Sequence, residues 1–182
     1  VTKADFVACH NPAYITKGLK MVRDVKPGGK FLVNCQWDAE EFSHHFPAEA
    51  KRYVVKNNIS VYLINAIDLA KEIGMGKRTN TVLQSAFFAL AKVLPAEDAL
   101  RYMKDAATKS YSKKGEAVVA ANHKAIDAGA TAFRKFEVPA GWATAEDRPD
   151  TLALEGREAI VKQVKELDPE NLKEEARKSS AD

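Results

Sequence analysis

The first 66 residues alternate short apolar runs with amphipathic stretches. Runs rich in β-forming residues lie at 4–10, 30–37 and 59–66, and turn-forming residues bound them. The stretches between the runs have helical spacing, and the first extends from Tyr14 to a Lys-Pro-Gly-Gly break at 26–29. This order predicts a parallel sheet with right-handed crossovers. The unbroken apolar run at 59–66 indicates that both sheet faces are covered.

After residue 66 the pattern is helical. Apolar residues recur at helical spacing over four segments: 68–74, 79–94, 96–110 and 113–136. A Pro- and Gly-containing linker, one more helix-like segment and a charged tail follow. The sequence therefore predicts an α/β fold, a parallel sheet flanked by helices with a helical C-terminal half. We expect one domain over 1–136, and a linker, one helix and a tail over 137–182.

Composition and charge narrow the class of protein. The chain has 182 residues, 46% of them hydrophobic, and a net charge of +3, which fits one globular domain. The mixed charges argue against a nucleic-acid partner, and no apolar run approaches the ~20 residues that span a bilayer. With no visible signal peptide, we expect a cytoplasmic protein and no membrane partner. Because Val1 is not Met and Phe6 already lies in a strand, we expect a piece of a longer or processed protein.

Two cysteines, Cys9 and Cys35, both lie in apolar, strand-like runs. We expect buried free thiols, and a disulfide between them is the alternative. Neither has a C-x-x-C partner, so this chain by itself is not expected to ligate an iron–sulfur cluster or a structural zinc.

Polar residues lie at the carboxyl end of each predicted strand. They are His10 and Asn11 at the end of the first run, Asn34 near the end of the second, and Asn65 near the end of the third. Parallel sheets bind ligands at the carboxyl ends of their strands, so these amides are candidates for a ligand site. Asn also suits turns and helix starts, which is the structural alternative.

The segment before the helix at 79–94 is unusually polar and flexible. It carries two glycines, then Lys77 and Arg78, then Asn80 at the helix mouth. The unpaired N–H groups and partial positive charge of a helix N-terminus favour an anionic or amide-bearing ligand. A plain cap by Thr79 or Asn80, with Arg78 in solvent, is the alternative.

Asn122 is a second anomaly. It lies on the apolar stripe of the predicted helix at 113–136. An unpaired amide there would cost about 1–3 kcal/mol, so it must find a partner in the backbone, a side chain or a ligand.

Four histidines raise the question of a metal-dependent hydrolase. His44 and His45 are adjacent, so on a helix they point about 100° apart and cannot easily share an ion. His10 has no carboxylate–histidine motif nearby, and His123 is expected to face outward. The sequence therefore does not favour this alternative.

Several long segments resemble one family closely. "KADFVACHNPAY", "NCQWDAEE", "KRYVVKNNISVYLINAIDLAKEIGMGKRTNTVLQSAFFALAKVLP" and "YSKKGEAVVAANHKAIDAG" are similar to the gamma-type domain of pyruvate:ferredoxin (flavodoxin) oxidoreductases. The likeness runs from Val1 to about residue 145 without appreciable gaps. It implies a Rossmann-like sheet in this domain.

The resemblance also implies an activity. Enzymes of this family oxidatively decarboxylate pyruvate, form acetyl-CoA and pass two electrons through iron–sulfur clusters to ferredoxin or flavodoxin. Thiamine diphosphate with Mg and the clusters would belong to other domains or subunits, and the complete enzyme would be a homodimer. This chain would help to bind coenzyme A and would be inactive alone. A non-catalytic packing module of the same enzyme is the alternative.

By resemblance, the asparagine of the family's Arg-x-Asn turn falls on Asn80, and that of its "VV-x-x-N" helix falls on Asn122. Both are associated with coenzyme A, and Arg78 matches the family's arginine. We therefore expect Asn80 and Asn122 to converge on one hollow. The family's glycine-rich phosphate segment and first strand would lie before Val1, so the domain is expected to be incomplete at its N-terminus. The turn departs from the family pattern at Lys77 and Thr79, and 146–182 shows no resemblance.

Overall fold

The computed structural model describes residues 2–16 and 21–146 of the 182-residue chain. These residues belong to one compact unit that ends at Glu146. Among the described residues, no helix combines the length and apolar character needed to cross a bilayer.

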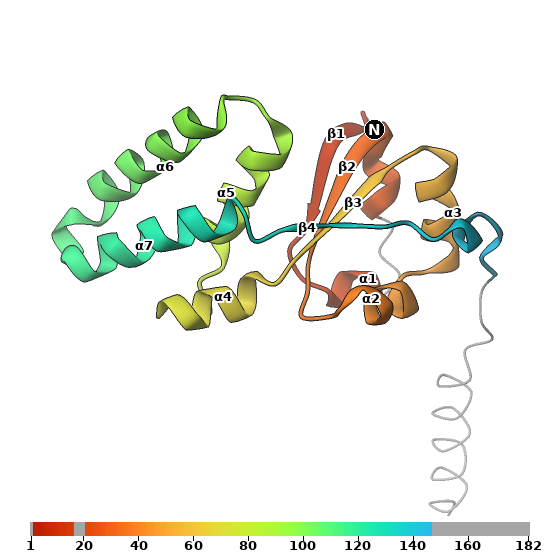
Figure 1. Ribbon diagram of the computed structural model, residues 1–182, viewed down its shortest axis with the longest axis horizontal. Coiled ribbons are helices and arrows are strands. Elements are labelled where there is room, and N and C mark those ends of the chain that lie inside the picture. Colours follow the sequence, from red (N-terminus) through yellow and green to blue (C-terminus); the bar gives the residue numbers. More distant parts are fainter. Residues whose placement is uncertain (1, 17–20, 147–182) are drawn as a thin grey trace, which may run out of the picture. The chain divides into compact units, whose positions relative to one another are not determined.

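A four-stranded sheet organises this unit (Figure 1). The strands are β1 (Ala4–Cys9), β2 (Val25–Asn34), β3 (Ser60–Ile64) and β4 (Arg134–Phe136), in the spatial order β1-β2-β3-β4. β1, β2 and β3 pair in parallel, which confirms the predicted strands and their orientation. β4 adds an antiparallel edge next to β3, and the sequence pattern did not predict it.

The Lys-Pro-Gly-Gly segment is not the break between elements that the sequence predicts, although the helical residues before it do end at Asp24. It lies inside β2, which begins at Val25. Ala4 pairs with Val25 and Phe6 with Lys30, so the segment between the two pairs bulges out of the ladder. Gly28 has a φ of 76°, and its N–H donates to the carbonyl of Asn57 at 2.8 Å. The bulge therefore keeps the strand continuous despite residues that favour turns.

One face of the sheet packs against the helices of the N-terminal half. These are α1 (Ala13–Thr16), the 3-10 helix η1 (Met21–Asp24), α2 (Ala39–His45) and α3 (Ala48–Lys56). Phe31, Val33 and Leu63 of the sheet meet Phe42 and Phe46 in one apolar core.

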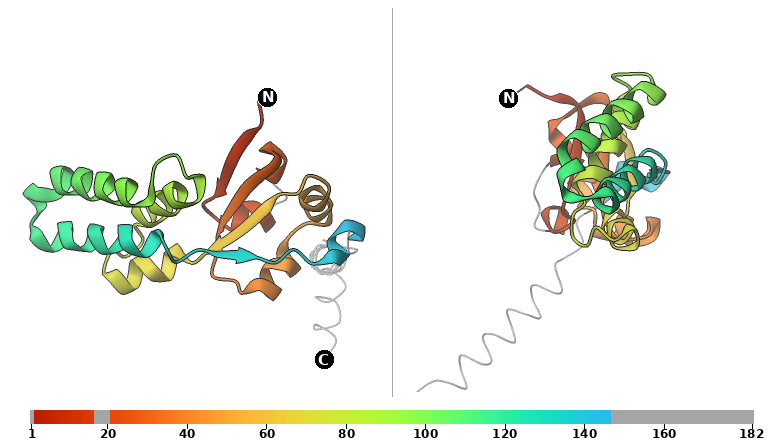
Figure 2. Two further views of the ribbon diagram at one scale, coloured as in Figure 1. Left: turned by 45° about the horizontal axis from the view of Figure 1, so that its top comes forward. Right: turned by 90° about the vertical axis from the view of Figure 1, so that its left-hand side faces the viewer.

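The other face packs against α4 (Ala66–Ile73), α5 (Asn80–Ala91) and α7 (Glu116–Gly129). Leu32 and Ile64 meet Val82, Leu83 and Ala125 in the second core. α6 (Ala96–Tyr111) runs antiparallel to α7, joined to it through the 3-10 helix η2 (Ser112–Lys114) (Figure 2). Both sheet faces are therefore covered, as the continuous apolar run of β3 predicted.

The predicted helix at 113–136 is wrong in its C-terminal part. α7 ends at Gly129, and Arg134–Phe136 form β4 instead. Phe133 and Phe136 fit the helical spacing, but they pack from extended backbone, Phe133 on the second core and Phe136 in the first.

Residues 137–146, which the sequence predicts to be a linker, are part of the unit and pack on its first core. The 3-10 helix η3 (Ala140–Thr144) places Trp142 in the first core with 4% exposure. Its ring stacks on Phe46 at a centroid distance of 5.3 Å, and its Nε1–H donates to Ser43. The expected helix and charged tail lie outside the described residues.

Candidate functional site

The asparagines at the strand ends hold the strand and helix ends in place. Asn34 is buried, and its Nδ2 donates to the carbonyl of His10 at 3.0 Å while its Oδ1 accepts from the N–H of Ala66 at 3.1 Å. Asn65 caps α4 by accepting from the N–H of Asp68 at 3.1 Å. Asn11 accepts from the N–H of Ala13 at 2.9 Å. These bonds support the structural alternative for the three amides.

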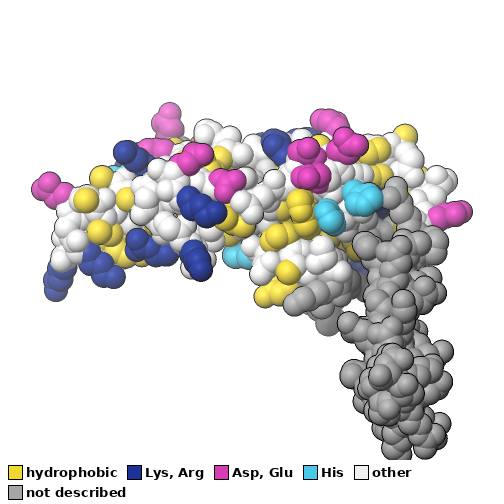
Figure 3. Space-filling view, turned by 90° about the horizontal axis from the view of Figure 1, so that it is seen from below, with side chains coloured by type: hydrophobic (Ala, Val, Ile, Leu, Met, Phe, Trp, Pro, Cys, Tyr) yellow, Lys and Arg dark blue, Asp and Glu magenta, His cyan; other side chains and the backbone are white. Residues whose placement is uncertain are grey.

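A crevice of about 280 Å³ opens where β2 and β3 end. Trp37 and Arg134 line it, and the guanidinium of Arg134 donates to the carbonyl of Trp37 at 3.1 Å. At its edge, hydrogen bonds from Asn65 and Gln36 lower the pKa of Asp68. Figure 3 views the molecule from below and shows that acidic side chains lie mainly along the upper edge of the helical part, with most of the basic side chains below them. The polar side chains of this crevice mostly bond to one another or to nearby backbone.

The mouth of α5 has the backbone that the glycines predicted. Gly74 ends α4 in the left-handed conformation with φ of 88°, and Gly76 has φ of 62°. Thr79 occupies the N-cap position without a side-chain hydrogen bond, so the alternative of a plain side-chain cap by Thr79 is not made. Asn80 is the first helical residue and is exposed. Arg78 is exposed, and its Nε–H donates to the nearby carbonyl of Met75 at 3.3 Å.

Asn122 is buried on α7 with 2% exposure, as its place on the apolar stripe predicted. Its Nδ2 donates to the carbonyl of Val118 at 2.8 Å. Its Oδ1 accepts from the hydroxyl of Thr81 on α5 at 3.3 Å. The amide thus finds both a backbone and a side-chain partner.

A cavity of about 200 Å³ lies between α5, α6 and α7. The residues that line it are Thr81, Gln84, Met103, Ala106, Ala107, Ser110, Tyr111, Asn122 and Ile126. Asn122 is therefore buried yet contributes to the wall of a cavity. Asn80 and Arg78 are not among these lining residues, although Asn80 directly precedes Thr81. The structure brings Asn122 together with Thr81 and leaves Asn80 at the helix mouth.

Close packing of α5 on α7 fixes the wall that carries Asn122. The hydroxyl of Ser85 donates to the carbonyl of Ile126. A Cβ at Gly129 would lie 2.3 Å from the carbonyl oxygen of Val82, so only glycine permits this approach. Together with the Thr81–Asn122 bond, these contacts form a seam along the two helices.

Sequence reasoning missed the cavity's other polar residues: Thr81, Gln84, Ser110 and Tyr111. Gln84 lies four residues after Asn80, one helical turn further along the same side of α5, and this spacing is a signal the sequence contains. Ser110 and Tyr111 end α6, and only the packing of α6 on α7 brings them to Asn122.

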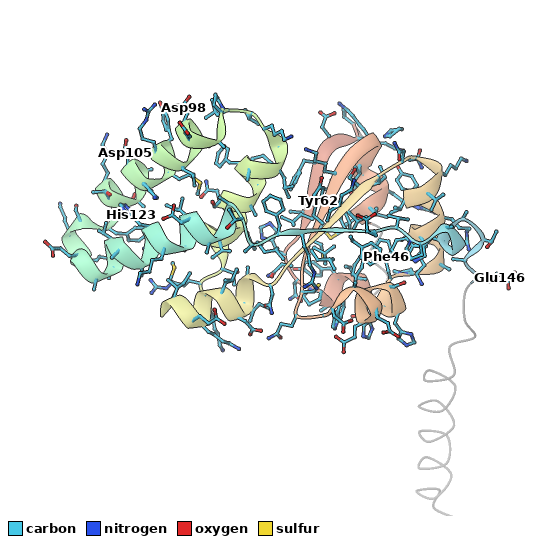
Figure 4. The ribbon with its side chains drawn as sticks, in the orientation of Figure 1. Phe46, Tyr62, Asp98, Asp105, His123 and Glu146 are labelled. Atoms are coloured by element: carbon cyan, nitrogen blue, oxygen red, sulfur yellow. The ribbon has the colours of Figure 1, made fainter. Side chains whose placement is uncertain are left out.

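The histidines take other contacts. His45 stacks on Trp37 at a centroid distance of 4.3 Å. The prediction that His123 faces outward is wrong. This histidine lies between α6 and α7, with its Nε2 at 3.1 Å from the carbonyl of Lys104 and 2.9 Å from the hydroxyl of Thr108 (Figure 4). Within residues 2–16 and 21–146, no three His, Cys, Asp or Glu side chains are placed to hold one metal ion.

Both cysteines are buried free thiols, as predicted. Burial raises the pKa of Cys9 to about 11, and the neighbouring Cys35 adds to the effect. Burial also raises the pKa of Cys35. These thiols pack in the first core, away from the α5–α7 cavity.

Comparison with known proteins identifies the family. Residues 1–132 match the family described as pyruvate ferredoxin/flavodoxin oxidoreductase. The chain belongs to this family. It is 38% identical over 167 residues to the pyruvate:ferredoxin oxidoreductase of Moorella thermoacetica, which covers 92% of the chain and 14% of that protein. It is 40% identical over 147 residues to the pyruvate-flavodoxin oxidoreductase of Klebsiella pneumoniae, which covers 81% of the chain and 12% of that protein.

A solved structure shares the fold of this family member. The pyruvate oxidoreductase subunit PORC from Thermotoga maritima superposes with a TM-score of 0.59 at 19% identity, over 75% of this chain and 67% of that one. The α/β fold predicted from the sequence is therefore confirmed. The chain spans only about one seventh or less of the length of the two oxidoreductases it matches.

Proposed function

We propose that this chain is the part of a pyruvate:ferredoxin or pyruvate:flavodoxin oxidoreductase that helps to bind coenzyme A. The complete enzyme would oxidatively decarboxylate pyruvate, form acetyl-CoA and reduce ferredoxin or flavodoxin. Membership of the family and the names of its relatives support the reaction. The environment of Asn122 supports the role of this chain.

The single observation that carries the proposal is a buried carboxamide in a cavity wall. Asn122 is 2% exposed on an otherwise apolar stripe, yet it lines a cavity with Thr81, Ser110 and Tyr111. Buried polar side chains are costly and are kept where they bond a partner. The pantetheine arm of coenzyme A carries amides, which both donate and accept hydrogen bonds as a carboxamide does.

The residues present fit a part of coenzyme A. A cavity of about 200 Å³ is smaller than typical ligand sites, which measure about 300–1,000 Å³, so it suits a segment of the molecule and not the whole. Exposed Lys77 and Arg78, with the N–H groups at the mouth of α5, would provide positive potential for its phosphates. Asn80 begins that helix. It would bond a polar group of the ligand that lies between the phosphates and the segment in the cavity.

This chain's residues would act by positioning. Coenzyme A supplies the thiol that accepts the acyl group. Asn122 and Asn80 would orient the molecule that carries this thiol, which lowers the entropic barrier to the transfer. Thiamine diphosphate, Mg and the iron–sulfur clusters would be held by other domains or subunits. Without those parts the isolated chain would be inactive.

Replacement of Asn80 tests the proposal. In the complete enzyme, Asn80→Ala should raise the KM for coenzyme A about threefold to tenfold, because one hydrogen bond contributes about 1 kcal/mol. The KM for pyruvate should remain nearly unchanged. Steady-state kinetics with each substrate varied in turn measures both values.

Gln36→Ala is the matched control. It removes an exposed carboxamide from the crevice at the ends of β2 and β3, outside the α5–α7 cavity. It should leave the KM for coenzyme A unchanged. An unchanged KM for coenzyme A in Asn80→Ala would reject the assignment of Asn80.

A second candidate is a packing module for the rest of the enzyme. An apolar groove of about 180 Å³ between α5 and α6 favours it, because Leu94 and Tyr102 line the groove and are 41% and 73% exposed. The buried amides would then serve folding alone. Binding of coenzyme A to the isolated chain in isothermal titration calorimetry would exclude this candidate. Tyr102→Ser tests this candidate in the complete enzyme. If the groove serves packing, the substitution should weaken the association of this chain with the other domains or subunits.

A further inference from the structure

The hydrogen bonds of Asn122 determine which way its carboxamide points. The carbonyl of Val118 can only accept, so the group at 2.8 Å from it is Nδ2, and Oδ1 faces the hydroxyl of Thr81 at 3.3 Å. A carboxamide has two N–H donors and two acceptor lone pairs. One of each is used, so one N–H and one lone pair of Asn122 remain for a ligand in the cavity.

We propose that Thr81 is a positioning residue that fixes the Asn122 carboxamide for the ligand in the α5–α7 cavity. This inference rests on the proposed role of Asn122 in coenzyme A binding. The bond to Val118 comes from the same helix and anchors only the nitrogen end of the amide. The bond from Thr81 comes from the neighbouring helix and adds a second anchor, so the free N–H and lone pair keep one direction.

Other contacts between α5 and α7 show that Thr81 is not needed to hold the two helices together. Ser85 lies one turn after Thr81 on α5 and also bonds to α7, through the carbonyl of Ile126. Ser85 does not line the cavity, whereas Thr81 does. Gly129 and Ser85 hold α5 against α7 without Thr81, so loss of the Thr81 hydroxyl leaves the seam closed. The hydroxyl of Thr81 therefore acts mainly on Asn122.

A double-mutant cycle in the complete enzyme tests this role. Thr81→Val keeps the shape of the side chain and removes the donor, and it should raise the KM for coenzyme A about threefold to tenfold with little change in kcat. Thr81→Ser keeps the hydroxyl and should restore the wild-type KM to within about twofold. Once Asn122 is alanine, Thr81→Val should have no further effect, because the two residues act as one unit.

The outcomes separate the inference from the proposed function. If Asn122→Ala leaves the KM for coenzyme A unchanged, the proposed role of Asn122 fails and the inference fails with it. If Asn122→Ala raises this KM but Thr81→Val does not, only the inference fails. Additive effects in the double variant overturn it as well. Ser43→Ala controls for a general loss of stability. It removes the acceptor of the Trp142 hydrogen bond in the first core, outside the α5–α7 cavity, so it should lower the melting temperature without changing the KM for coenzyme A.

Discussion

At the residue scale, burial determines the chemistry of the two thiols. Cys9 and Cys35 are 1% and 2% exposed in the first core, and burial raises the pKa of both. A thiol with a raised pKa stays protonated and is a poor nucleophile and a poor metal ligand. The two cysteines therefore act as apolar core residues, and neither faces the cavity that holds Asn122.

The raised pKa of Cys9 predicts a loss of stability at high pH. Its pKa rises from 9.0 to about 11 on folding, so the folded protein keeps a proton that the unfolded chain releases. The contribution of this group is full below pH 9 and is lost as the pH rises toward 11. Urea unfolding between pH 8 and 11 should show a steeper fall in the free energy of unfolding for the wild type than for Cys9→Ala. Parallel curves for the two proteins would contradict the assignment.

Single residues also mark the limit of sequence reasoning at the site. The position of Asn122 on an apolar stripe predicted a buried amide that needs a partner, and the structure confirms both statements. The partner itself was not predictable. Thr81 lies 41 residues earlier, and only the packing register of α5 on α7 brings its hydroxyl to Asn122. That register depends on how Ser85 and Gly129 pack between the two helices, which the sequence of either helix alone does not specify.

At the scale of elements, the seam between α5 and α7 shapes the candidate site. Gly129 permits the close approach of the two helices, because a Cβ there would meet Val82 and Ser85. Gly129→Ala should therefore destabilise the protein by about 1–3 kcal/mol, the usual cost of overpacking. Gly141→Ala is the control, since its Cβ would meet nothing within 4 Å, and it should change stability by less than about 0.5 kcal/mol. Chemical denaturation measures the free energy of unfolding of both variants. An equal loss in the two would contradict the close approach of α5 and α7 at Gly129.

Elements with a strong local signal were predictable, and those that depend on distant contacts were not. β1, β3 and α6 follow from unbroken apolar runs or regular helical spacing. β4 was missed because Phe133 and Phe136 continue the spacing of α7, and its pairing with β3 lies outside any local pattern. The bulge in β2 was missed because Pro27 and the glycines after it are typical of a turn.

At the scale of the whole molecule, the described residues form one unit with a core on each sheet face. The first core includes Trp142 from the segment after β4, and the second packs α4, α5 and α7 on the sheet. The unit matches only 12–14% of the length of its Moorella and Klebsiella relatives. On our proposal, its exposed apolar groove and its polar cavity both work within a larger enzyme.

The most direct test of the central claim is the dissociation constant of coenzyme A, measured by isothermal titration calorimetry on the complete enzyme. The wild type is compared with Asn122→Ala, and with Ser43→Ala as the control for a general loss of stability, since Ser43 bonds Trp142 in the first core. We predict that Asn122→Ala raises the dissociation constant at least about fivefold, because it removes a buried carboxamide from the cavity, while Ser43→Ala stays within about twofold. Equal dissociation constants for the wild type and Asn122→Ala would contradict a coenzyme A site at the α5–α7 cavity.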